Sequence, residues 1–226
     1  MVLKNILLTG GTGTLGTELR KIKKDLLCPS SRQMNITDLF SVNRFFESNE
    51  IQLVIHAAAY TDVTSSEKNF EKVINTNIVG TYNVLKNCID RGIKMVYIST
   101  DYVFDGEKGN YTTEDPINPL TKYAKSKAAA ELMVRMYNNS LCIRTSFYGK
   151  NFPYERALED QWTTKDYIDV MAPKILEQCL SNKTGIVHCY SKKRTIFELA
   201  KQRKHDVIKI QRKDLMSKVP CDTSLV

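Results

Sequence analysis

Three side chains in the middle of the chain have the types and spacing needed to protonate a carbonyl oxygen. Thr100 ends an apolar run, and Tyr123 precedes Lys127 by four residues, about one helical turn. A phenol alone has a pKa of about 10 and is a poor acid–base group at neutral pH. A nearby ammonium group lowers that pKa, and a hydroxyl at Thr100 can hydrogen-bond and orient a carbonyl oxygen. The pattern therefore predicts reduction of a ketone, if the chain also holds a hydride donor.

The same spacing also occurs at Tyr82 and Lys86, so spacing alone is weak evidence. Tyr82 falls inside a long predicted helix, on its apolar stripe, and we expect it to pack in the core. Tyr123 instead begins a predicted helix, after a loop rich in Gly, Pro and Thr. Position in the chain therefore selects Tyr123 and Lys127 as the reactive pair.

A glycine-rich loop between the first predicted strand and the first predicted helix could hold the hydride donor. Gly10, Gly13 and Gly16 directly follow the apolar run 5–9. Glycine permits a tight turn and the close approach of backbone to a pyrophosphate, which then lies at the helix N-terminus. We expect a dinucleotide to bind here, in contact also with Thr14 and Leu15.

The residues after the second predicted strand, around 26–29, bear on the type of dinucleotide. An NAD-binding protein typically carries an acidic residue there, which binds the adenosine ribose. This chain has Ser30, Ser31 and Arg32 instead, and these suit a 2′-phosphate. The sequence therefore favours NADP(H) over NAD(H).

Strand and helix patterns alternate along residues 5–144. Apolar runs at 5–9, 53–57, 94–99 and 141–144 read as buried strands, and helical patterns separate them. This alternation predicts an α/β fold, a doubly wound parallel sheet (Rossmann fold) with helices on both faces. Ligands of such sheets bind beyond the carboxyl ends of the strands, where each motif above falls.

The regular alternation of strand and helix patterns ends after Gly149, which divides the chain into two expected parts. Residues 1–149 would form an NADP-binding Rossmann domain, and residues 150–226 a small substrate-binding lobe. Within the lobe we expect a helix at 166–180, a strand at 186–190, a helix opened by the capping box Thr195-x-x-Glu198, and a strand at 207–210.

Composition and charge narrow the functional classes. The net charge of +8 comes largely from 192–194 and 201–213, which we interpret as solvated surface rather than a nucleic-acid site. The six cysteines form no C-x-x-C pair, which predicts free thiols and no metal site. No apolar run approaches the roughly 18 residues of a membrane span. Residues 1–4 lead straight into the first strand, so we expect no signal peptide and a cytoplasmic location.

The chain resembles the extended short-chain dehydrogenase/reductase family and, within it, the dTDP-4-dehydrorhamnose reductases. The likeness rests on the glycine loop, on the helix motif Asn77-x-x-Gly80-Thr81 and on the stretches 56–61, 99–106 and 123–127. It covers residues 3–149 firmly and residues 150–226 loosely.

The resemblance implies roles for individual residues. Thr100, Tyr123 and Lys127 would form the catalytic triad, and Tyr123 and Lys127 would also bind the cofactor. Tyr102 would face the sugar, and Asp160-Gln161 resembles a substrate-lobe signature. Further cofactor contacts would come from two stretches: Asn35 and Ile36 near the adenine, and Ala57, Ala58 and Ala59 along the cofactor's path.

The residues after Thr100 separate two reaction types. The related 4,6-dehydratases carry Asp-Glu directly after the threonine, whereas this chain has Asp101-Tyr102. The resemblance therefore implies net NADPH-dependent reduction of a nucleotide-linked (dTDP or UDP) 4-keto-6-deoxyhexose in deoxysugar synthesis. The expected partner is a nucleotide-sugar substrate, and the expected assembly is a homodimer.

Two alternatives remain open because the region after Gly149 is shorter than in the family. The regulatory subunit of methionine adenosyltransferase resembles these reductases and would imply a cofactor-binding, non-catalytic role. A sugar-nucleotide epimerase would retain its cofactor and consume none.

Overall fold

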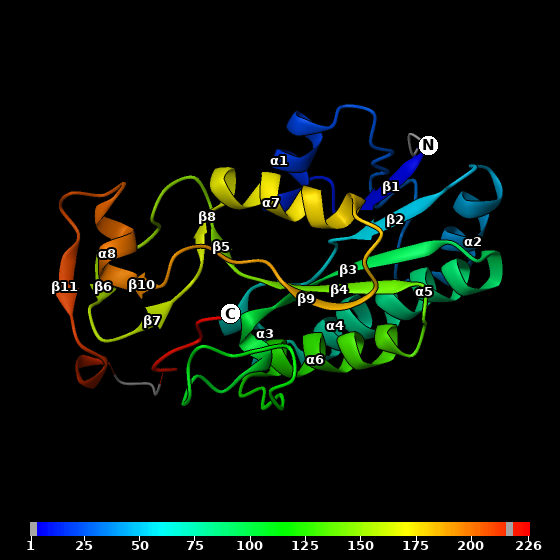
Figure 1. Ribbon diagram of the computed structural model, residues 1–226. Coiled ribbons are helices and arrows are strands. Elements are labelled where there is room, and N and C mark those ends of the chain that lie inside the picture. Colours follow the sequence, from blue (N-terminus) through cyan, green and yellow to red (C-terminus); the bar gives the residue numbers. More distant parts are fainter. Residues whose placement is uncertain (1–3, 216–218) are drawn as a thin grey trace.

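A five-stranded parallel sheet forms the centre of the computed structural model, which describes residues 4–215 and 219–226 (Figure 1). The strand order is β1-β2-β3-β4-β9. The strands are β1 (Ile6–Thr9), β2 (Leu53–His56), β3 (Lys94–Thr100), β4 (Ser140–Thr145) and β9 (Gly185–His188). The first four strands are buried almost throughout, as expected where helices cover both faces of a sheet. The predicted parallel α/β fold is confirmed.

The strand expected near 26–29 is reduced to a single bridge between Leu27 and Leu7. The Leu27 amide donates to the Ile6 carbonyl, and the Leu8 amide donates to the Leu27 carbonyl. Pro29 lacks a backbone N–H, and Gln33 and Met34 donate to the Ser30 carbonyl in the turn that follows. The chain thus turns away from β1 after one pair of bonds.

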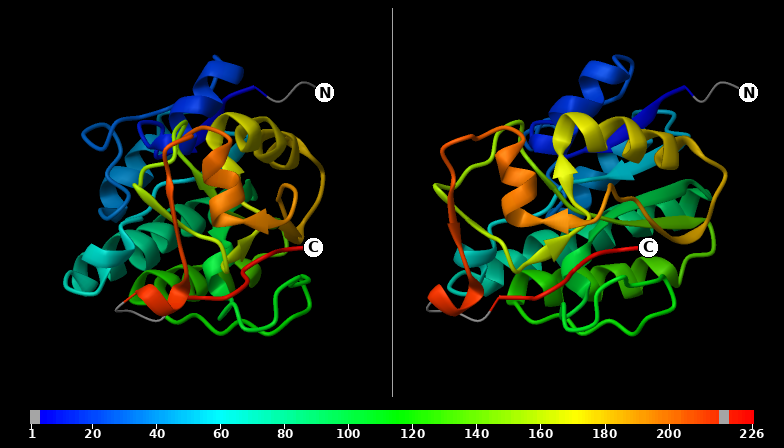
Figure 2. Two further views of the ribbon diagram at one scale, coloured as in Figure 1. Left: turned by 90° about the vertical axis from the view of Figure 1, so that its left-hand side faces the viewer. Right: turned by 60° about the vertical axis from the view of Figure 1, so that its left-hand side comes forward.

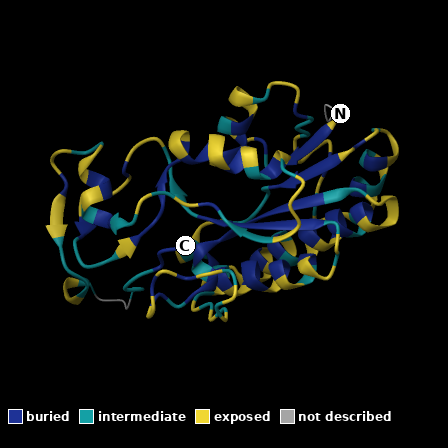
Figure 3. Ribbon diagram, in the orientation of Figure 1, coloured by how far each residue is buried: buried dark blue, intermediate teal, exposed yellow. Residues whose placement is uncertain are grey.

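Helices cover both faces of the sheet, as Figures 1 and 2 show. On one face, α1 (Thr14–Ile22) packs against α7 (Ile168–Leu180) and shares a core with β1. On the other lie α2 (Leu39–Glu47), α5 (Gly80–Arg91) and α6 (Lys122–Arg135). Asp38 caps α2 by accepting from the Phe40 amide. Buried residues lie on the strands and on the helix sides that face other elements, while exposed residues lie on the outer sides of the helices (Figure 3).

The long helix expected at 70–91 contains a wider turn. The helix α4 (Phe70–Ile74) leads into a π-helical turn, η1 (Asn75–Val79), which continues as α5. A further short helix, α3 (Val63–Ser66), precedes α4. The π-helical turn buries the side chain of Asn77, and such turns are frequent at functional sites.

Tyr82 is not a core residue, so that expectation is wrong. Its side chain is 47% exposed. The stripe of Ile74, Tyr82 and Ile89 lies on the outward side of α4 and α5, where all three are at least 42% exposed. The inward side is formed instead by residues such as Val84, Leu85 and Cys88.

A small lobe lies at one end of the sheet (Figure 2). It contains three two-stranded pairs: β5 (Phe147–Tyr148) with β8 (Asp166–Tyr167), β6 (Arg156–Leu158) with β11 (Ile208–Ile210), and β7 (Trp162–Thr163) with β10 (Arg194–Thr195). Helix α8 (Ile196–Lys201) opens with the predicted capping box of Thr195 and Glu198. Two 3-10 turns, η2 (Asp101–Val103) and η3 (Arg212–Asp214), complete the assignment.

The division of the chain differs from the one expected. Helix α7 and strand β9 lie after residue 149, yet they belong to the Rossmann core. The lobe therefore consists of two segments, about 147–167 before α7 and about 194–215 after β9. The segment 219–226 then runs back along the lobe, where Leu225 bridges to Tyr111 and Asp222 to Trp162. Among the described residues no helix is long and apolar enough to cross a membrane, and all six cysteines are free.

Candidate active site

The glycine loop is packed so closely that side chains could not be accommodated at two of its positions. Gly10 has φ of +72°, and a Cβ there would lie 2.7 Å from the Ala58 nitrogen. A Cβ on Gly16 would lie 2.6 Å from Gly11 Cα and closer still to the Gly10 carbonyl oxygen. The bare backbone amides before α1 therefore border the cleft, an arrangement that fits a pyrophosphate.

A chain of buried hydrogen bonds holds this loop to β2 and to the π-helical turn. Thr81 Oγ1 donates to the Asn77 carbonyl, so its oxygen accepts from His56 Nε2 at 3.0 Å. His56 Nδ1 then accepts from Thr9 Oγ1 at 2.9 Å, and Thr9 Oγ1 accepts from the Ala58 amide. This order requires a neutral imidazole, and burial lowers the pKa of His56 to about 3.

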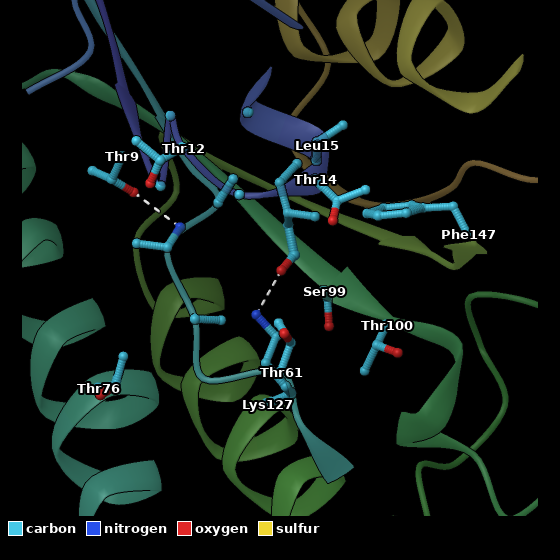
Figure 4. Close-up of a pocket in the computed structure, with 18 of the residues that line it drawn as sticks. Thr9, Thr12, Thr14, Leu15, Thr61, Thr76, Ser99, Thr100, Lys127 and Phe147 are labelled. Atoms are coloured by element: carbon cyan, nitrogen blue, oxygen red, sulfur yellow. Dashed lines mark hydrogen bonds between the residues drawn. The ribbon is translucent and has the colours of Figure 1, made fainter. Parts of the chain in front are cut away.

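A cleft of about 800 Å³ joins the glycine loop to the predicted reactive residues. It runs along the carboxyl ends of the strands, and Figure 4 shows Thr14, Ser99, Thr100 and Lys127 on its walls. Most predicted site residues line it together: Gly10, Gly13, Thr14, Leu15, Gly16, Ser30, Ser31, Asn35, Ile36, Ala57, Ala58, Ala59, Thr100, Tyr102, Tyr123 and Lys127.

Three predicted site residues lie outside this cleft. Arg32 borders a shallower neighbouring depression together with Arg44. Asp160 accepts from the Arg212 amide at 2.9 Å, and the Gln161 carbonyl accepts from the Ile196 amide, so both support the lobe. Contact of Asp160 and Gln161 with a sugar stays a prediction.

The end of the cleft where the sequence predicts the adenine is shaped by short polar contacts and by the close packing of Ile36 against Gly80. The Ser30 amide and hydroxyl both donate to Gln33 Oε1 at 2.9 Å. Asn35 Oδ1 accepts from the amide and hydroxyl of Thr37. Gly80 allows Ile36 to pack against the helix, because a Cβ at Gly80 would lie 2.8 Å from Ile36 Cδ1. The motif Asn77-x-x-Gly80-Thr81 thus supports the cofactor loops.

Thr100 and Tyr123 come together because β3 ends where α6 begins. Thr100 Oγ1 accepts from the Tyr102 amide and donates to Asp101 Oδ1, each at 3.2 Å. Tyr123 lies in the first turn of α6, which Thr121 caps by accepting from the Ala124 amide. Burial raises the pKa of Tyr123 well above its ordinary value, and the Asp101 carboxylate raises it further; the Thr100 hydroxyl and the Lys165 ammonium act in the opposite direction.

Lys127 lines the cleft with Tyr123, and its ammonium is held by the backbone of β3. Its Nζ donates to the Ile98 carbonyl at 2.7 Å (Figure 4) and lies 4.1 Å from the centre of the Tyr97 ring. Burial lowers the pKa of Lys127 to about 7. The ammonium that favours the phenolate of Tyr123 in this structure belongs to Lys165.

The motif search missed several residues that line the cleft, among them Phe147, Tyr148 and Lys165. Phe147 and Tyr148 form β5, directly after the end of β4, and Lys165 directly precedes β8. The pairing of β5 with β8 brings these segments together. Phe147 and Tyr148 could have been found from their position after a predicted strand, whereas neither a motif nor a predicted strand points to Lys165.

Comparison with known proteins agrees with this geometry. Residues 4–175 match the family model described as RmlD substrate binding domain. The chain is 33% identical over 208 residues to spore coat polysaccharide biosynthesis protein SpsK of Bacillus subtilis, covering 82% of this chain and 73% of SpsK. It is 34% identical over 161 residues to dTDP-4-dehydrorhamnose reductase of Aggregatibacter actinomycetemcomitans, covering 66% of this chain but only about half (55%) of that enzyme's length.

Solved structures show the same likeness. A dTDP-4-dehydrorhamnose reductase of Bacillus anthracis, solved in complex with NADP, superposes with a TM-score of 0.89 at 25% identity, covering 100% of this chain and 91% of that one.

A sequence relative of another kind is methionine adenosyltransferase 2 subunit beta of Xenopus tropicalis. It is 32% identical over 149 residues, covering 60% of this chain and 44% of that protein. The matched length and the shared architecture show that the chain belongs to the RmlD family, within the extended short-chain dehydrogenases/reductases.

Proposed function

We propose that the protein is an NADPH-dependent reductase of the 4-keto group of a nucleotide-linked 4-keto-6-deoxyhexose, with dTDP or UDP as the nucleotide. The observation that carries this proposal is the single cleft in which a glycine loop for a dinucleotide meets Thr100, Tyr123 and Lys127. Similarity to proteins named dTDP-4-dehydrorhamnose reductase supports the class of substrate.

The residues around the cleft fit a nicotinamide dinucleotide, which supplies a hydride to the carbonyl carbon when it is bound. In place of its bond to Asp101, the Thr100 hydroxyl donates to the carbonyl oxygen of the substrate and orients it. Tyr123 transfers its phenolic proton to the same oxygen as negative charge develops there. Lys127 is held by the Ile98 carbonyl, where its ammonium can bind the nicotinamide ribose.

NADP(H) rather than NAD(H) is the proposed cofactor. Ser31 borders both the main cleft and the neighbouring depression, and Arg32 and Arg44 contribute two positive charges to that depression. A 2′-phosphate would find both guanidinium groups near it.

The exposed apolar face of α5 and α6 supports the homodimer that the sequence leads us to expect. Tyr82 and Ile89 on α5, with Leu132 and Met136 on α6, are 47–84% exposed. A second copy of the chain would cover these side chains, since large exposed apolar side chains of this kind favour interaction sites.

The test is an assay of the purified protein with dTDP- and UDP-4-keto-6-deoxy sugars, comparing oxidation of NADPH with that of NADH. We expect turnover with NADPH. Tyr123→Phe should reduce turnover at least about 1,000-fold, because the proton donor is lost, while the Kd for NADPH stays within about twofold. Full activity in Tyr123→Phe would contradict the mechanism.

A second candidate function is a non-catalytic, NADP-binding regulatory subunit, which the likeness to methionine adenosyltransferase 2 subunit beta favours. It predicts NADPH binding without turnover of any keto-sugar, together with co-purification of a methionine adenosyltransferase. The same assay therefore separates the two candidates.

A further inference from the structure

The segment between β7 and β8 brings a buried lysine to the substrate end of the cleft. Lys165 is 8% exposed and lines the cleft with Thr100 and Tyr123. Its Nζ lies 5.2 Å from the centre of the Tyr102 ring and 5.1 Å from the centre of the Tyr148 ring. Lys165 therefore places a positive charge between two aromatic faces.

This charge has no ion-pair partner in the structure. Among residues 4–215 and 219–226, no carboxylate oxygen lies within 4.0 Å of Lys165 Nζ. The nearby carboxylate of Asp101 accepts instead from Thr100 at 3.2 Å and from Thr223 at 3.1 Å. A buried ammonium without an ion pair lowers stability, so the folded protein retains Lys165 at a cost.

The lysine nevertheless stays protonated at neutral pH. Burial alone would lower the pKa of Lys165, but the Asp101 carboxylate favours the charged form, and the pKa lies above its ordinary value. Lys165 therefore presents three N–H donors and no acceptor to the cleft.

We propose that Lys165 is a substrate-binding residue whose ammonium donates hydrogen bonds to oxygens of the sugar beside the reacting carbonyl. This inference rests on the proposed function of the same cleft. The rings of Tyr102 and Tyr148 can pack against the C–H face of a hexose, while the ammonium between them binds its oxygens. The same charge offsets the negative charge that develops on the carbonyl oxygen. The ligand class is thus a hexose with oxygen on the carbons next to the keto group.

Binding measurements test the inference without turnover. Calorimetry in the presence of NADP⁺ would compare dTDP-rhamnose and dTDP for wild type, Lys165→Met and the exposed control Lys183→Met. We expect Lys165→Met to weaken dTDP-rhamnose at least tenfold and dTDP less than twofold, and Lys183→Met to change neither. Equal weakening of both ligands would place the ammonium on the diphosphate and overturn the inference, as would unchanged binding of both.

Thermal unfolding separates a binding role from a structural one. Removing an unpaired buried charge should leave the Tm of Lys165→Met equal to or above that of wild type, whereas a structural lysine would lower it together with ligand affinity, which would overturn the inference. Lys165→Gln provides a second uncharged variant that is less hydrophobic than Lys165→Met. Lys165→Arg should bind dTDP-rhamnose more tightly than Lys165→Met does, because it keeps the positive charge. A wild-type protein that binds dTDP-rhamnose but reduces no keto-sugar would contradict the proposed function alone, because these measurements do not depend on turnover.

Discussion

The two ends of the cleft are built in different ways. At the cofactor end, the surface is formed largely by backbone, and its contacts are made by neutral groups such as Thr9, His56 and Thr81. At the substrate end, charged and aromatic side chains form the surface, among them Tyr102, Tyr148 and Lys165. The cofactor end follows the chain locally, whereas the substrate end needs the lobe to fold back onto the sheet.

The two buried lysines show the same contrast. Lys127 donates to a backbone carbonyl, and burial lowers its pKa to about 7. Lys165 keeps its charge between two tyrosine rings. A backbone-lined end can hold a constant cofactor in many relatives, while an end lined by side chains can change its substrate through single substitutions. Three further variants, two of them with matched controls, test whether the two ends of the cleft differ in this way.

The largest effect is expected from Gly16→Ala at the cofactor end. Its Cβ would meet the backbone of Gly10 and Gly11, so the loop must shift. We expect the affinity for NADPH to fall at least about 100-fold and the free energy of unfolding to fall by about 3 kcal/mol. Fluorescence titration and chemical denaturation measure the two quantities.

Gly149 provides a matched control at the substrate end of the same cleft. A Cβ on Gly149 would meet nothing within 4 Å, so Gly149→Ala should stay within about 0.5 kcal/mol of wild type. Equal losses in the two variants would show that the cofactor end is no more tightly constrained than the substrate end.

A smaller effect, on the pH dependence of stability, is expected from replacing His56, which is neutral in the folded protein. The unfolded chain takes up a proton at this residue below about pH 6.5, whereas the folded protein does so only near pH 3. Because the unfolded state binds more protons in this window, stability falls as the pH falls, by roughly 2 kcal/mol between pH 7 and pH 5. Denaturation of His56→Gln across this range should lack that part of the slope. The control variant His205→Gln, at an exposed position, should keep the full pH dependence of stability. An unchanged pH dependence in His56→Gln would contradict a neutral His56 in the hydrogen-bond chain.

The smallest effect is expected from Tyr82→Phe. Tyr82 and Lys86 have the same Tyr-x-x-x-Lys spacing as Tyr123 and Lys127. The Tyr82 side chain is 47% exposed on α5 and does not line the cleft. We expect activity within twofold of wild type and stability within about 0.5 kcal/mol. A large loss of activity would show that position in the fold does not distinguish Tyr82 from Tyr123.

Sequence alone predicted the parallel sheet, the glycine loop and Thr100, because each depends on a strand and the residues directly after it. It also predicted Tyr123 and Lys127 in the same cleft, because they begin the helix that follows β3. It did not predict the exposure of Tyr82, since an apolar stripe does not reveal whether it faces the sheet or the solvent. It also failed to identify Lys165, whose place depends on the pairing of β5 with β8, two short segments separated by seventeen residues. The return of α7 and β9 to the core was missed for the same reason: the pairing partner of β9 lies about forty residues earlier.

The position of β9 late in the chain determines when the central sheet can be completed during synthesis. During synthesis the edge of β4 stays unpaired until residues 185–188 have emerged, after much of the lobe. An unpaired apolar strand edge is a template for aggregation, and the core residues that α7 covers, such as Ile143, are open to solvent until then. A polypeptide that ends near residue 149 would keep that edge and that surface exposed. The first segment of the lobe is therefore enclosed within the folding unit of the sheet, and only the second segment follows it.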